Sequence, residues 1–380
     1  MEKRSVSDIA NLLSKLTHNK QVYVGYPTST DFDNQHSFEL LNHHLNNIGD
    51  PFNRPTCFGT FAHERAVVEF FMQLYHTSVE NAWGYVAGCS TEAILYACWR
   101  YREEASNKVI LLSSEYAHYC NAKIANILGI RHQIIPSHPN GSIQIDALSE
   151  VISAAPEYSY ILVATMGSTI TSSYDDVAAA KSAFLTADVE YFIHLDGAFD
   201  GAFLPLVEKY RLGEYFTSVN VSGHKFLGAP MPSGILLIDK QFVSGEYIQY
   251  INNDDITIGG SRNGLTPVLI YNTIKALNSQ AGMKEKYLAC LKKAEAFLLT
   301  LQQHSINCWK NEKAITIVLE DLPAPVSQKW HFPQYRNRST LTCLPKFTPQ
   351  MLNEFITDAL NPDAIDMARA KQFDYQVESL

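Results

Sequence analysis

Five short apolar segments in the middle of this 380-residue chain constrain its fold more than any other feature. Helical segments such as 91–104 and 146–154 lie between most of them. Strands that are apolar along their whole length and alternate with helices indicate a largely parallel sheet covered by helices on both faces. The sequence therefore predicts an α/β fold. Its strand candidates are Val109–Leu112, Tyr160–Ala164, Tyr191–Leu195, Ser218–Val221 and Ile235–Ile238.

The segments on either side predict the domain organisation. Residues 1–60 contain a helical segment near Ser5–Leu16 but too little apolar sequence for a core of their own, so we expect an N-terminal arm that packs on a partner subunit. Residues 61–275 would form a large domain, 276–365 a smaller C-terminal α/β domain, and 366–380 a loosely held tail. The smaller domain would follow a long helix at 267–303, broken near Gly282, and would contain strands at Ala314–Glu320 and Leu341–Leu344 and a helix at Pro349–Ala359.

Composition argues against several classes of partner and location. A net charge of -9 and a pI of about 5.8 argue against nucleic acid or an anionic membrane surface as a partner. No apolar run approaches the length of a membrane span, and the segment MEKRSVSDIANLLSKL lacks the apolar centre of a signal peptide. Seven cysteines without paired spacing predict neither a disulfide framework nor a metal site. We therefore expect a cytoplasmic protein.

A lysine follows one of the strand candidates. In SVNVSGHKFLGAPMPSGILLID, Lys225 lies between two apolar segments, where an unpaired charge is costly. A neutral amine there would be a nucleophile, and condensation with an aldehyde cofactor would remove the charge. The alternative is a lysine whose charged end reaches solvent from the end of a strand.

Two further polar residues follow other strand candidates. Asp196 ends the segment YFIHLD, where its carboxylate would suit a ring nitrogen that must stay protonated, or would simply cap the strand end. His118 follows VILLSS. Because ligands bind beyond the carboxyl ends of parallel strands, we expect Asp196, His118 and Lys225 to share one site.

Two segments of small residues could bind phosphate. The turn in GYVAGCSTEAILYACW opens a helix, and backbone N–H groups there, with the hydroxyls of Ser90 and Thr91, suit an anion. A capping box is the alternative for this turn. The glycine-rich segment TIGGSRNG, with Ser261 and Arg262, is either a linker between lobes or a second source of phosphate donors.

Taken together, SGHKFLGAPMPSG, HLDGAF, SSEYAHY, TIGGSRNG and NNIGDPF resemble the pyridoxal-phosphate-dependent group II amino-acid decarboxylases. The resemblance runs from about Val22 to Ala359 and is strongest to the bacterial histidine and plant serine decarboxylases. It implies the PLP-dependent transferase-like fold (fold type I) and a homodimer with active sites at the subunit interface. The implied reaction converts a polar L-amino acid, histidine first, to its amine and CO2. Serine decarboxylation, or another lyase reaction of the same fold, is the alternative.

The resemblance also implies roles for individual residues. Lys225 would bind pyridoxal 5′-phosphate covalently, Asp196 would pair with its pyridine nitrogen, and His118 would stack on its ring. The residues that would hold the phosphate are Ser90, Thr91, Ser222 and His224, with Ser261 reaching it from the partner subunit.

The chain departs from the family pattern at five positions. Cys89 and Ile94 replace a glycine and an asparagine of the phosphate turn, and Ser172 replaces a glycine in GSTITSSYDD. Asp254 stands in place of a basic residue and Thr340 in place of a histidine, two changes that would affect substrate recognition. An acidic residue in the substrate pocket would disfavour an acidic substrate, whereas a solvated loop carboxylate would have no such effect.

Two other functions fit part of the pattern. Cysteine desulfurases share SGHKxxG but need a catalytic cysteine in the loop downstream, and residues 246–261 contain none. A non-catalytic relic that only binds the cofactor would fit the altered phosphate turn. However, Lys225, Asp196 and His118 are all present, so we expect an enzyme.

Overall fold

The computed structural model describes residues 9–18, 24–30, 34–53 and 59–365. The chain divides into two compact units, one made of residues 32–287 and the other of residues 1–31 with 288–380. Residues 9–18 are helical, whereas the start of the predicted N-terminal helix and the predicted tail lie outside the described residues. The domain boundaries predicted at 60, 275 and 365 stay predictions.

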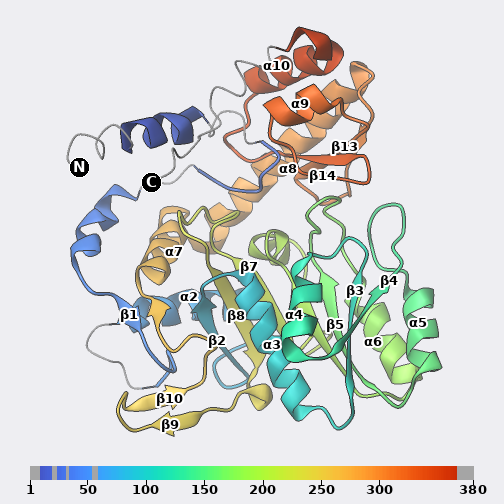
Figure 1. Ribbon diagram of the computed structural model, residues 1–380. Helices are drawn as coiled ribbons and strands as arrows, with labels where there is room; N and C mark the ends of the chain where they lie inside the picture. Colours follow the sequence, from blue (N-terminus) through green and yellow to red (C-terminus); the bar gives the residue numbers. More distant parts are fainter. Residues whose placement is uncertain (1–8, 19–23, 31–33, 54–58, 366–380) are drawn as a thin grey trace, which may run out of the picture. The chain divides into compact units, whose positions relative to one another are not determined.

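A seven-stranded sheet forms the centre of the unit 32–287, in the order β2-β8-β7-β6-β5-β3-β4 (Figure 1). The neighbours from β4 to β7 pair in parallel, and β8 is antiparallel to both β7 and β2. The predicted mostly parallel α/β fold is therefore confirmed. The strands are β2 (Ala82–Ala87), β3 (Val109–Ser114), β4 (Arg131–Ile135), β5 (Ser159–Thr165), β6 (Tyr191–Asp196), β7 (Ser218–Ser222) and β8 (Gly234–Asp239).

Helices cover this sheet and bury its apolar side chains (Figure 1). Helix α2 packs on β2 and β8, α3 on β6 to β8, α4 on β3 and β4, and α6 on β6. One apolar core joins α3 and α4 to the strands through buried residues such as Tyr96, Ile124, Leu111 and Leu236. The helices are α2 (Phe61–Leu74), α3 (Ser90–Glu104), α4 (Cys120–Leu128), α5 (Ile145–Ala154), α6 (Val177–Thr186) and α7 (Leu265–Ala276).

Short elements connect these layers. Two small antiparallel pairs join β1 to β11 and β9 to β10. The short strands are β1 (Asn46–Asn47), β9 (Glu246–Ile248), β10 (Asn253–Asp255) and β11 (Arg262–Asn263). The 3-10 helices of this unit are η1 (Gln35–Asn42), η2 (Asp200–Ala202), η3 (Leu204–Leu206) and η4 (Lys240–Phe242).

The long helix predicted at 267–303 is two helices, α7 and α8 (Ser279–Gln303). The break falls just before the predicted position, where Asn278 and Ser279 take left-handed φ values of 54° and 62°. Gly282 lies inside α8 instead. A Cβ on it would come within 1.8 Å of the Leu277 carbonyl oxygen, so only glycine lets the helix start this close to the preceding turn.

The other unit contains a four-stranded antiparallel sheet in the order β12-β13-β15-β14. Val24 belongs to its buried core, together with residues such as Leu319 and Phe355, and the Thr342 N–H donates to the Val24 carbonyl at 3.0 Å. The predicted small α/β domain is thus present. Its elements after α8 are β12 (Cys308–Trp309), β13 (Thr316–Glu320), α9 (Ala324–Lys329), β14 (Gln334–Tyr335), β15 (Arg338–Thr342), α10 (Pro349–Leu360) and η5 (Pro362–Ala364).

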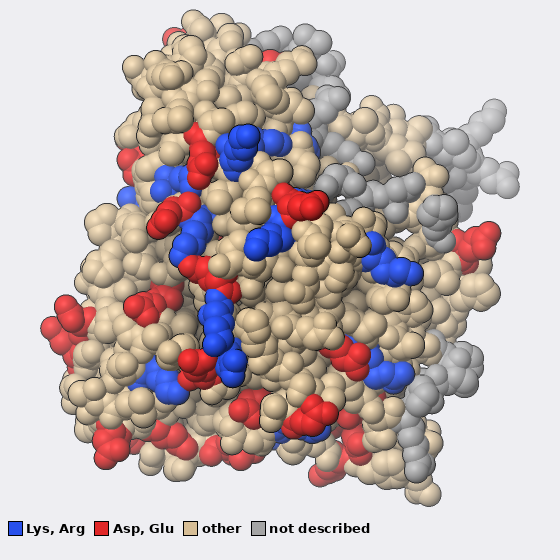
Figure 2. Space-filling view, turned by 180° about the vertical axis from the view of Figure 1, so that it is seen from behind, with Lys and Arg blue, Asp and Glu red and all other residues tan. Residues whose placement is uncertain are grey.

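Charged side chains are mixed on the face drawn in Figure 2. Lys and Arg side chains lie next to Asp and Glu side chains over much of that face, and neither sign gathers into one broad patch of described residues. Separately, within the described ranges no helix has both the length and the apolar character needed to cross a bilayer.

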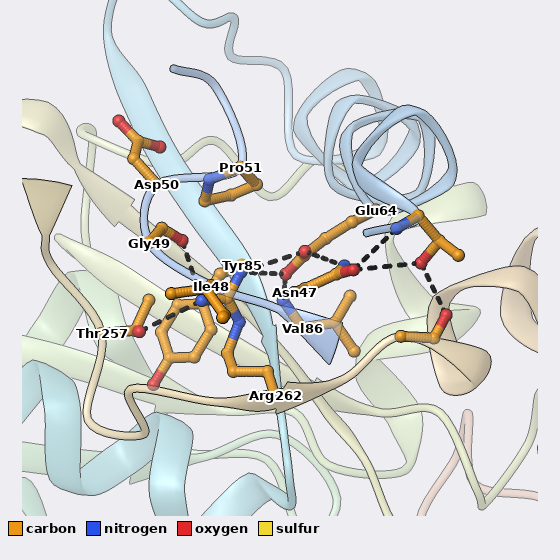
Figure 3. A network of polar contacts seen from close by, with 12 residues as sticks. Asn47, Ile48, Gly49, Asp50, Pro51, Glu64, Tyr85, Val86, Thr257 and Arg262 are labelled. Atoms are coloured by element: carbon orange, nitrogen blue, oxygen red, sulfur yellow. Dashed lines mark hydrogen bonds and ion pairs between the residues drawn. The ribbon is translucent and has the colours of Figure 1, made fainter. Parts of the chain in front are cut away.

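Four separate segments of the unit 32–287 meet at one buried ion pair (Figure 3). The side chains of Glu64, in α2, and Arg262, in β11, are 1% and 4% exposed. Both carboxylate oxygens of Glu64 accept from Arg262 Nη2, at 3.1 and 3.0 Å. Glu64 also accepts from the Val86 backbone N–H of β2 at 3.0 Å and from Asn47 Nδ2 at 2.6 Å. The carboxylate is therefore satisfied on every side.

Arg262 links the NNIGDPF and TIGGSRNG segments (Figure 3). Its Nη1 donates to the Gly49 carbonyl at 2.8 Å and to Thr257 Oγ1 at 3.1 Å. The guanidinium carbon lies 5.4 Å from the centre of the Tyr85 ring. Because Ser261 directly precedes Arg262, the ion pair fixes the end of the loop that carries this predicted phosphate-binding residue.

Removing the arginine tests the importance of this pair. Arg262→Met leaves Glu64 buried without its counter-charge, so we expect a loss of about 3–5 kcal/mol in the free energy of unfolding, measured by denaturant titration. Arg211→Met, at the exposed pair with Glu214, is the control and should cost less than about 1 kcal/mol. Equal losses in the two variants would contradict a structural role for the buried pair.

Candidate active site

The predicted site residues gather at the carboxyl ends of β6 and β7. Asp196 is the last residue of β6 and Ser222 is the last residue of β7. These strands are parallel neighbours, with Asp196 aligned to Asn220, so their ends lie at the same edge of the sheet. Lys225 follows β7 in the turn after Ser222. The strand ends therefore bring the carboxylate and the lysine to one location, as parallel-sheet topology predicts.

Asp196 has one carboxylate oxygen held by the protein and one free. Its Oδ1 accepts from the Ala198 N–H at 3.2 Å and from Asn220 Nδ2 at 3.1 Å. Within the described residues, Oδ2 accepts no hydrogen bond from the protein. The residue is 7% exposed, and this oxygen is available to a ligand.

A buried chain of hydrogen bonds supports Asp196 from inside the sheet. Asn220 Oδ1 lies 2.7 Å from His194 Nε2, and His194 Nδ1 lies 2.7 Å from Ser218 Oγ, which accepts from the Tyr101 hydroxyl at 2.8 Å. Since Asn220 gives its amide N–H to Asp196, its oxygen must accept from His194. Burial lowers the pKa of His194, which keeps the ring neutral with one donor and one acceptor. Every donor in the chain thus points toward Asp196, which fixes the orientation of its carboxyl group.

Lys225 lies among several ionisable groups. Burial lowers the pKa of its amine, while the nearby carboxylates of Asp196 and Asp200 act in the opposite direction. Within the described residues its amine donates no hydrogen bond. A lysine with a lowered pKa holds more neutral amine at a given pH, and the neutral amine is the form that attacks a carbonyl carbon.

His118 lies in the turn before α4 and belongs to the same cluster. Burial lowers the pKa of its imidazole, and the charges of Asp196 and Lys225 also act on it, in opposite directions. The Cys120 N–H donates to His118 Nδ1 at 3.3 Å, which orients the ring. The structure therefore brings Lys225, Asp196 and His118 together.

The first turn of α3 lies beside the end of β7. The hydroxyls of Ser90 and Ser222 are 2.7 Å apart, and Thr91 hydrogen-bonds the Cys120 thiol. The N-cap residue, Cys89, makes no side-chain cap bond, so the Ser and Thr hydroxyls do not serve as the helix cap. This start of α3 offers hydroxyls and unpaired backbone N–H groups to an anion.

The other two predicted phosphate ligands differ in their surroundings. His224 Nδ1 accepts from the Ser233 N–H at 3.1 Å, so the ring is tied to the turn before β8. Ser261 is exposed, and its hydroxyl accepts from Asn46 Nδ2 at 3.1 Å. Within the same chain, Ser261 lines a cavity of about 110 Å³ with Gly88 and residues of the adjoining loops.

These groups fit pyridoxal phosphate. The cofactor has a ring nitrogen, an aldehyde and a phosphate. The first two match side-chain groups that have no protein partner, and the phosphate matches a turn that can bind an anion. The free Asp196 Oδ2 suits the ring nitrogen, the amine of Lys225 suits the aldehyde, and the Ser90 and Ser222 hydroxyls at the start of α3 suit the phosphate.

The altered phosphate turn keeps this fit. Cys89 has a φ of -164°, extended backbone that any residue adopts, so the family glycine is not required there. Ile94 is buried in the apolar core beneath α3. Ser172 is different, because its φ of 43° is left-handed and costs a non-glycine residue about 1 kcal/mol.

The two departures assigned to substrate recognition lie elsewhere. Asp254 is in the β9–β10 hairpin, where its Oδ2 accepts from Asn53 Nδ2 at 2.7 Å. Thr340 is buried in β15 of the other unit, and its hydroxyl donates to the Gly25 carbonyl at 3.2 Å. Both side chains have local structural partners, so neither contact supports a role in choosing the substrate.

Sequence reasoning missed several polar residues of this region. His194, Ser218 and Asn220 lie inside strands, and Tyr174 donates a hydrogen bond to the buried Asp200. The available signal was polar residues within apolar strands, as in YFIHLD and SVNVS. The sequence alone does not show which residues such side chains contact, because that depends on the register of the neighbouring strands.

Comparison with solved structures identifies the same fold. L-methionine decarboxylase from Streptomyces sp. 590 superposes with a TM-score of 0.83 at 21% identity, covering 94% of each chain. A sphingosine-1-phosphate lyase from Burkholderia pseudomallei K96243 superposes with a TM-score of 0.75 at 17% identity, covering 98% of this chain and 93% of that one. At these identities the likeness establishes the fold alone.

Comparison of sequences adds the family. Residues 64–318 match the model of the pyridoxal-dependent decarboxylase conserved domain. A histidine decarboxylase from Morganella morganii is 33% identical over 82% of this chain and 84% of its own length. One from Mesorhizobium japonicum is 29% identical over 95% of this chain and 99% of its own length. The chain therefore belongs to the pyridoxal-dependent decarboxylase family, as the resemblance of its motifs predicts.

Proposed function

We propose that this protein decarboxylates L-histidine to its amine, with the residue roles that the sequence predicts. The reaction class is pyridoxal-phosphate-dependent decarboxylation of an amino acid, which the family establishes. The observation that carries the proposal is the cluster of Asp196, Lys225 and His118, which follow the carboxyl ends of β6, β7 and β3 respectively. Histidine is favoured because several of the similar curated proteins are histidine decarboxylases.

When bound, pyridoxal 5′-phosphate supplies an electron sink for the electron pair that remains after CO2 leaves. Asp196 would hold a proton at the ring nitrogen through its free Oδ2, because the chain from Asn220 to Tyr101 fixes the orientation of the carboxyl group. That proton lets the ring accept electron density. The structural contribution of the buried chain is to hold the Asp196 carboxyl group in a fixed orientation.

The remaining residues would bind and orient. Lys225 would hold the cofactor covalently and give way to the amine of the substrate. His118, neutral through burial, would cover one face of the ring. The phosphate ligands would be Ser90, Thr91, Ser222, His224 and Ser261, the first four grouped around the start of α3 and the turns after β7.

Serine decarboxylation is the second candidate, because the sequence also resembles the plant serine decarboxylases. The contact of Asp254 with Asn53 gives that aspartate a structural role, so the preference for a non-acidic substrate rests on the histidine-decarboxylating relatives. A non-catalytic relic is disfavoured, since the lysine and its carboxylate partner are both in place.

We also propose a homodimer with shared active sites. Apolar side chains before residue 60 are exposed in the single chain, at Leu12, Leu13, Leu16, Phe38 and Leu41. Apolar surface of this kind suits burial against a second subunit. A cytoplasmic location is proposed as well, because the cysteines of the described residues are unpaired thiols, most of them buried.

A panel of L-amino acids scored for CO2 release tests the reaction. We expect release from histidine and none from glutamate or aspartate. Serine turnover without histidine turnover would keep the reaction class and replace the substrate. Efficient turnover of aspartate or glutamate would refute the preference for a non-acidic side chain.

The lysine assignment has a spectroscopic test. Wild-type protein should show the visible absorbance of a lysine-bound cofactor, and Lys225→Ala should bind the cofactor without that band. Lys286→Ala is the control, because Lys286 is also buried but donates to the Phe226 carbonyl at 3.2 Å. A band that persists in Lys225→Ala would place the linkage on another lysine.

Hybrid dimers test whether the sites are shared. Lys225→Ala and Ser261→Asp are each expected to be inactive, the second because its charge repels phosphate. If Ser261 serves the partner's site, mixing the two after subunit exchange restores activity, since one site of each hybrid carries neither change. The control mixes Lys225→Ala with Asp196→Asn, which belong to the same chain's cluster and should not complement. Absence of activity in both mixtures would show that Ser261 serves its own subunit.

A further inference from the structure

Helix α3 is joined to strand β7 at both ends of the strand. At the edge of the sheet that carries the candidate site, Ser90 Oγ in the first turn of α3 lies 2.7 Å from Oγ of Ser222, the last residue of β7. At the opposite edge, the Tyr101 hydroxyl donates at 2.8 Å to Oγ of Ser218, the first residue of β7. The roles implied by the resemblance use the residues of the first contact and not those of the second.

The two contacts fit one rigid helix placed on one rigid strand. Tyr101 follows Ser90 by eleven positions, which is about 16 Å along a helix axis. Ser222 follows Ser218 by four positions, which is about 13 Å along a strand. The reach of a tyrosine side chain covers the small difference, so both hydroxyl contacts form in a single placement of α3. A shift of the helix by one residue along β7 would break both.

Packing holds the Tyr101 ring in this position. The residue is fully buried, and its ring stacks on Phe192 of β6 with the ring centroids 4.3 Å apart. The same ring meets Phe242 edge-on at 5.1 Å, and the hydroxyl also hydrogen-bonds Thr217, directly before Ser218. Because the ring is held by apolar contacts, Tyr101→Phe keeps the packing and removes only the hydrogen bonds between α3 and the start of β7.

The residue midway between the two contacts holds Asp196. Side chains two positions apart share a face of a strand, so Ser218, Asn220 and Ser222 lie on one face of β7. Asn220 Nδ2 donates to Asp196 Oδ1 at 3.1 Å, and the Asn220 carbonyl accepts from the Gly197 N–H at 3.2 Å. The placement of α3 on β7 therefore reaches the Asp196 carboxyl group through one strand residue.

We propose that α3 couples the two ends of the cofactor site, with Tyr101 as the positioning residue. An anion bound beside Ser90 fixes the start of α3 against the end of β7. The bond from Tyr101 to Ser218 carries that placement to the start of the strand, and Asn220 then orients Asp196 toward the ring nitrogen. Binding at either end favours binding at the other, as linkage requires. The coupling rests on the proposed function, which places phosphate at the start of α3 and the ring at Asp196.

The first measurement separates the two ends of the cofactor. Pyridoxal, which lacks the phosphate, is titrated into the full chain freed of cofactor, with and without inorganic phosphate, and its binding is followed by the visible absorbance. In wild type we expect saturating phosphate to tighten pyridoxal binding about fivefold or more, the lower end of the usual range for coupled sites. Tyr101→Phe should lose most of this factor, because one neutral hydrogen bond is worth about 2- to 10-fold.

The second measurement uses inorganic phosphate alone. Phosphate is titrated into the full chain freed of cofactor, and nitrogen NMR follows the ring of His194, assigned by the loss of its signals in His194→Gln. This ring reports on the coupling because it lies between Ser218 and Asn220. Wild type should show a phosphate-dependent shift, and Tyr101→Phe a smaller one. If pyridoxal does not bind at all, the proposed function fails, while the His194 shift still tests the coupling through α3.

Tyr160→Phe is the matched control. Tyr160 is also fully buried, and its hydroxyl donates to the Ala155 carbonyl at 2.6 Å, a contact that does not involve α3. This variant should leave the pyridoxal factor and the His194 shift unchanged. The proposal is overturned if wild type shows neither effect, if Tyr101→Phe matches wild type in both, or if Tyr160→Phe lowers them equally. Should Tyr101→Phe fail to fold, Ser218→Ala removes the same contact and decides by the same criterion.

Discussion

The buried ion pair of Glu64 and Arg262 is the contact on which the arrangement around the site depends. Removing both charges from water is costly, and the cost is offset by close pairing and by further hydrogen bonds, which both Glu64 oxygens and Arg262 Nη1 and Nη2 make, whereas Arg262 Nε has no partner in the described part of the chain. Here the partners come from α2, β2 and the segments around Gly49 and Thr257, which are far apart in the sequence (Figure 3). The pair is therefore favourable only when all four segments are in register. The ion pair therefore helps to place the loop that carries Ser261 beside the start of α3.

The sheet handles charge differently at its carboxyl edge. Asp196 is held at Oδ1 by a one-directional chain of neutral donors. Lys225 receives no such support, and burial makes its neutral form easier to reach. The carboxyl group of Asp196 is thus fixed in position, and burial favours the neutral form of the neighbouring Lys225 amine. This contrast is what a site needs when it must both stabilise a protonated ring and supply a nucleophilic amine.

Much of the fold and part of the site could be predicted from the sequence. The five predicted strands are confirmed because nearly all of their residues are buried in the sheet and most of them are apolar. Strand β4 was missed because it lies at the sheet edge and only Ile135 is fully buried, and β2 because AWGYVA runs directly into the turn before α3. Lys225 and Asp196 were accessible because they follow strands, whereas the Asp200–Tyr174 contact depends on the path of two loops, which no periodicity records.

Backbone conformation explains the different costs of the two positions, Cys89 and Ser172, at which this chain lacks a glycine of the family pattern. Cys89 replaces a glycine where the backbone is extended, so the change carries no conformational cost. Ser172 replaces one where φ is positive, and a cost remains. Its loop is held by Ser168, whose hydroxyl bonds Thr171 Oγ1 at 2.6 Å and the Ser173 N–H at 3.1 Å. Tyr174 continues the same loop and reaches Asp200. The strained serine, its hydroxyl network and the Tyr174–Asp200 hydrogen bond are therefore parts of one structural feature, in which the cost of one positive φ is offset by the contacts that fix the loop.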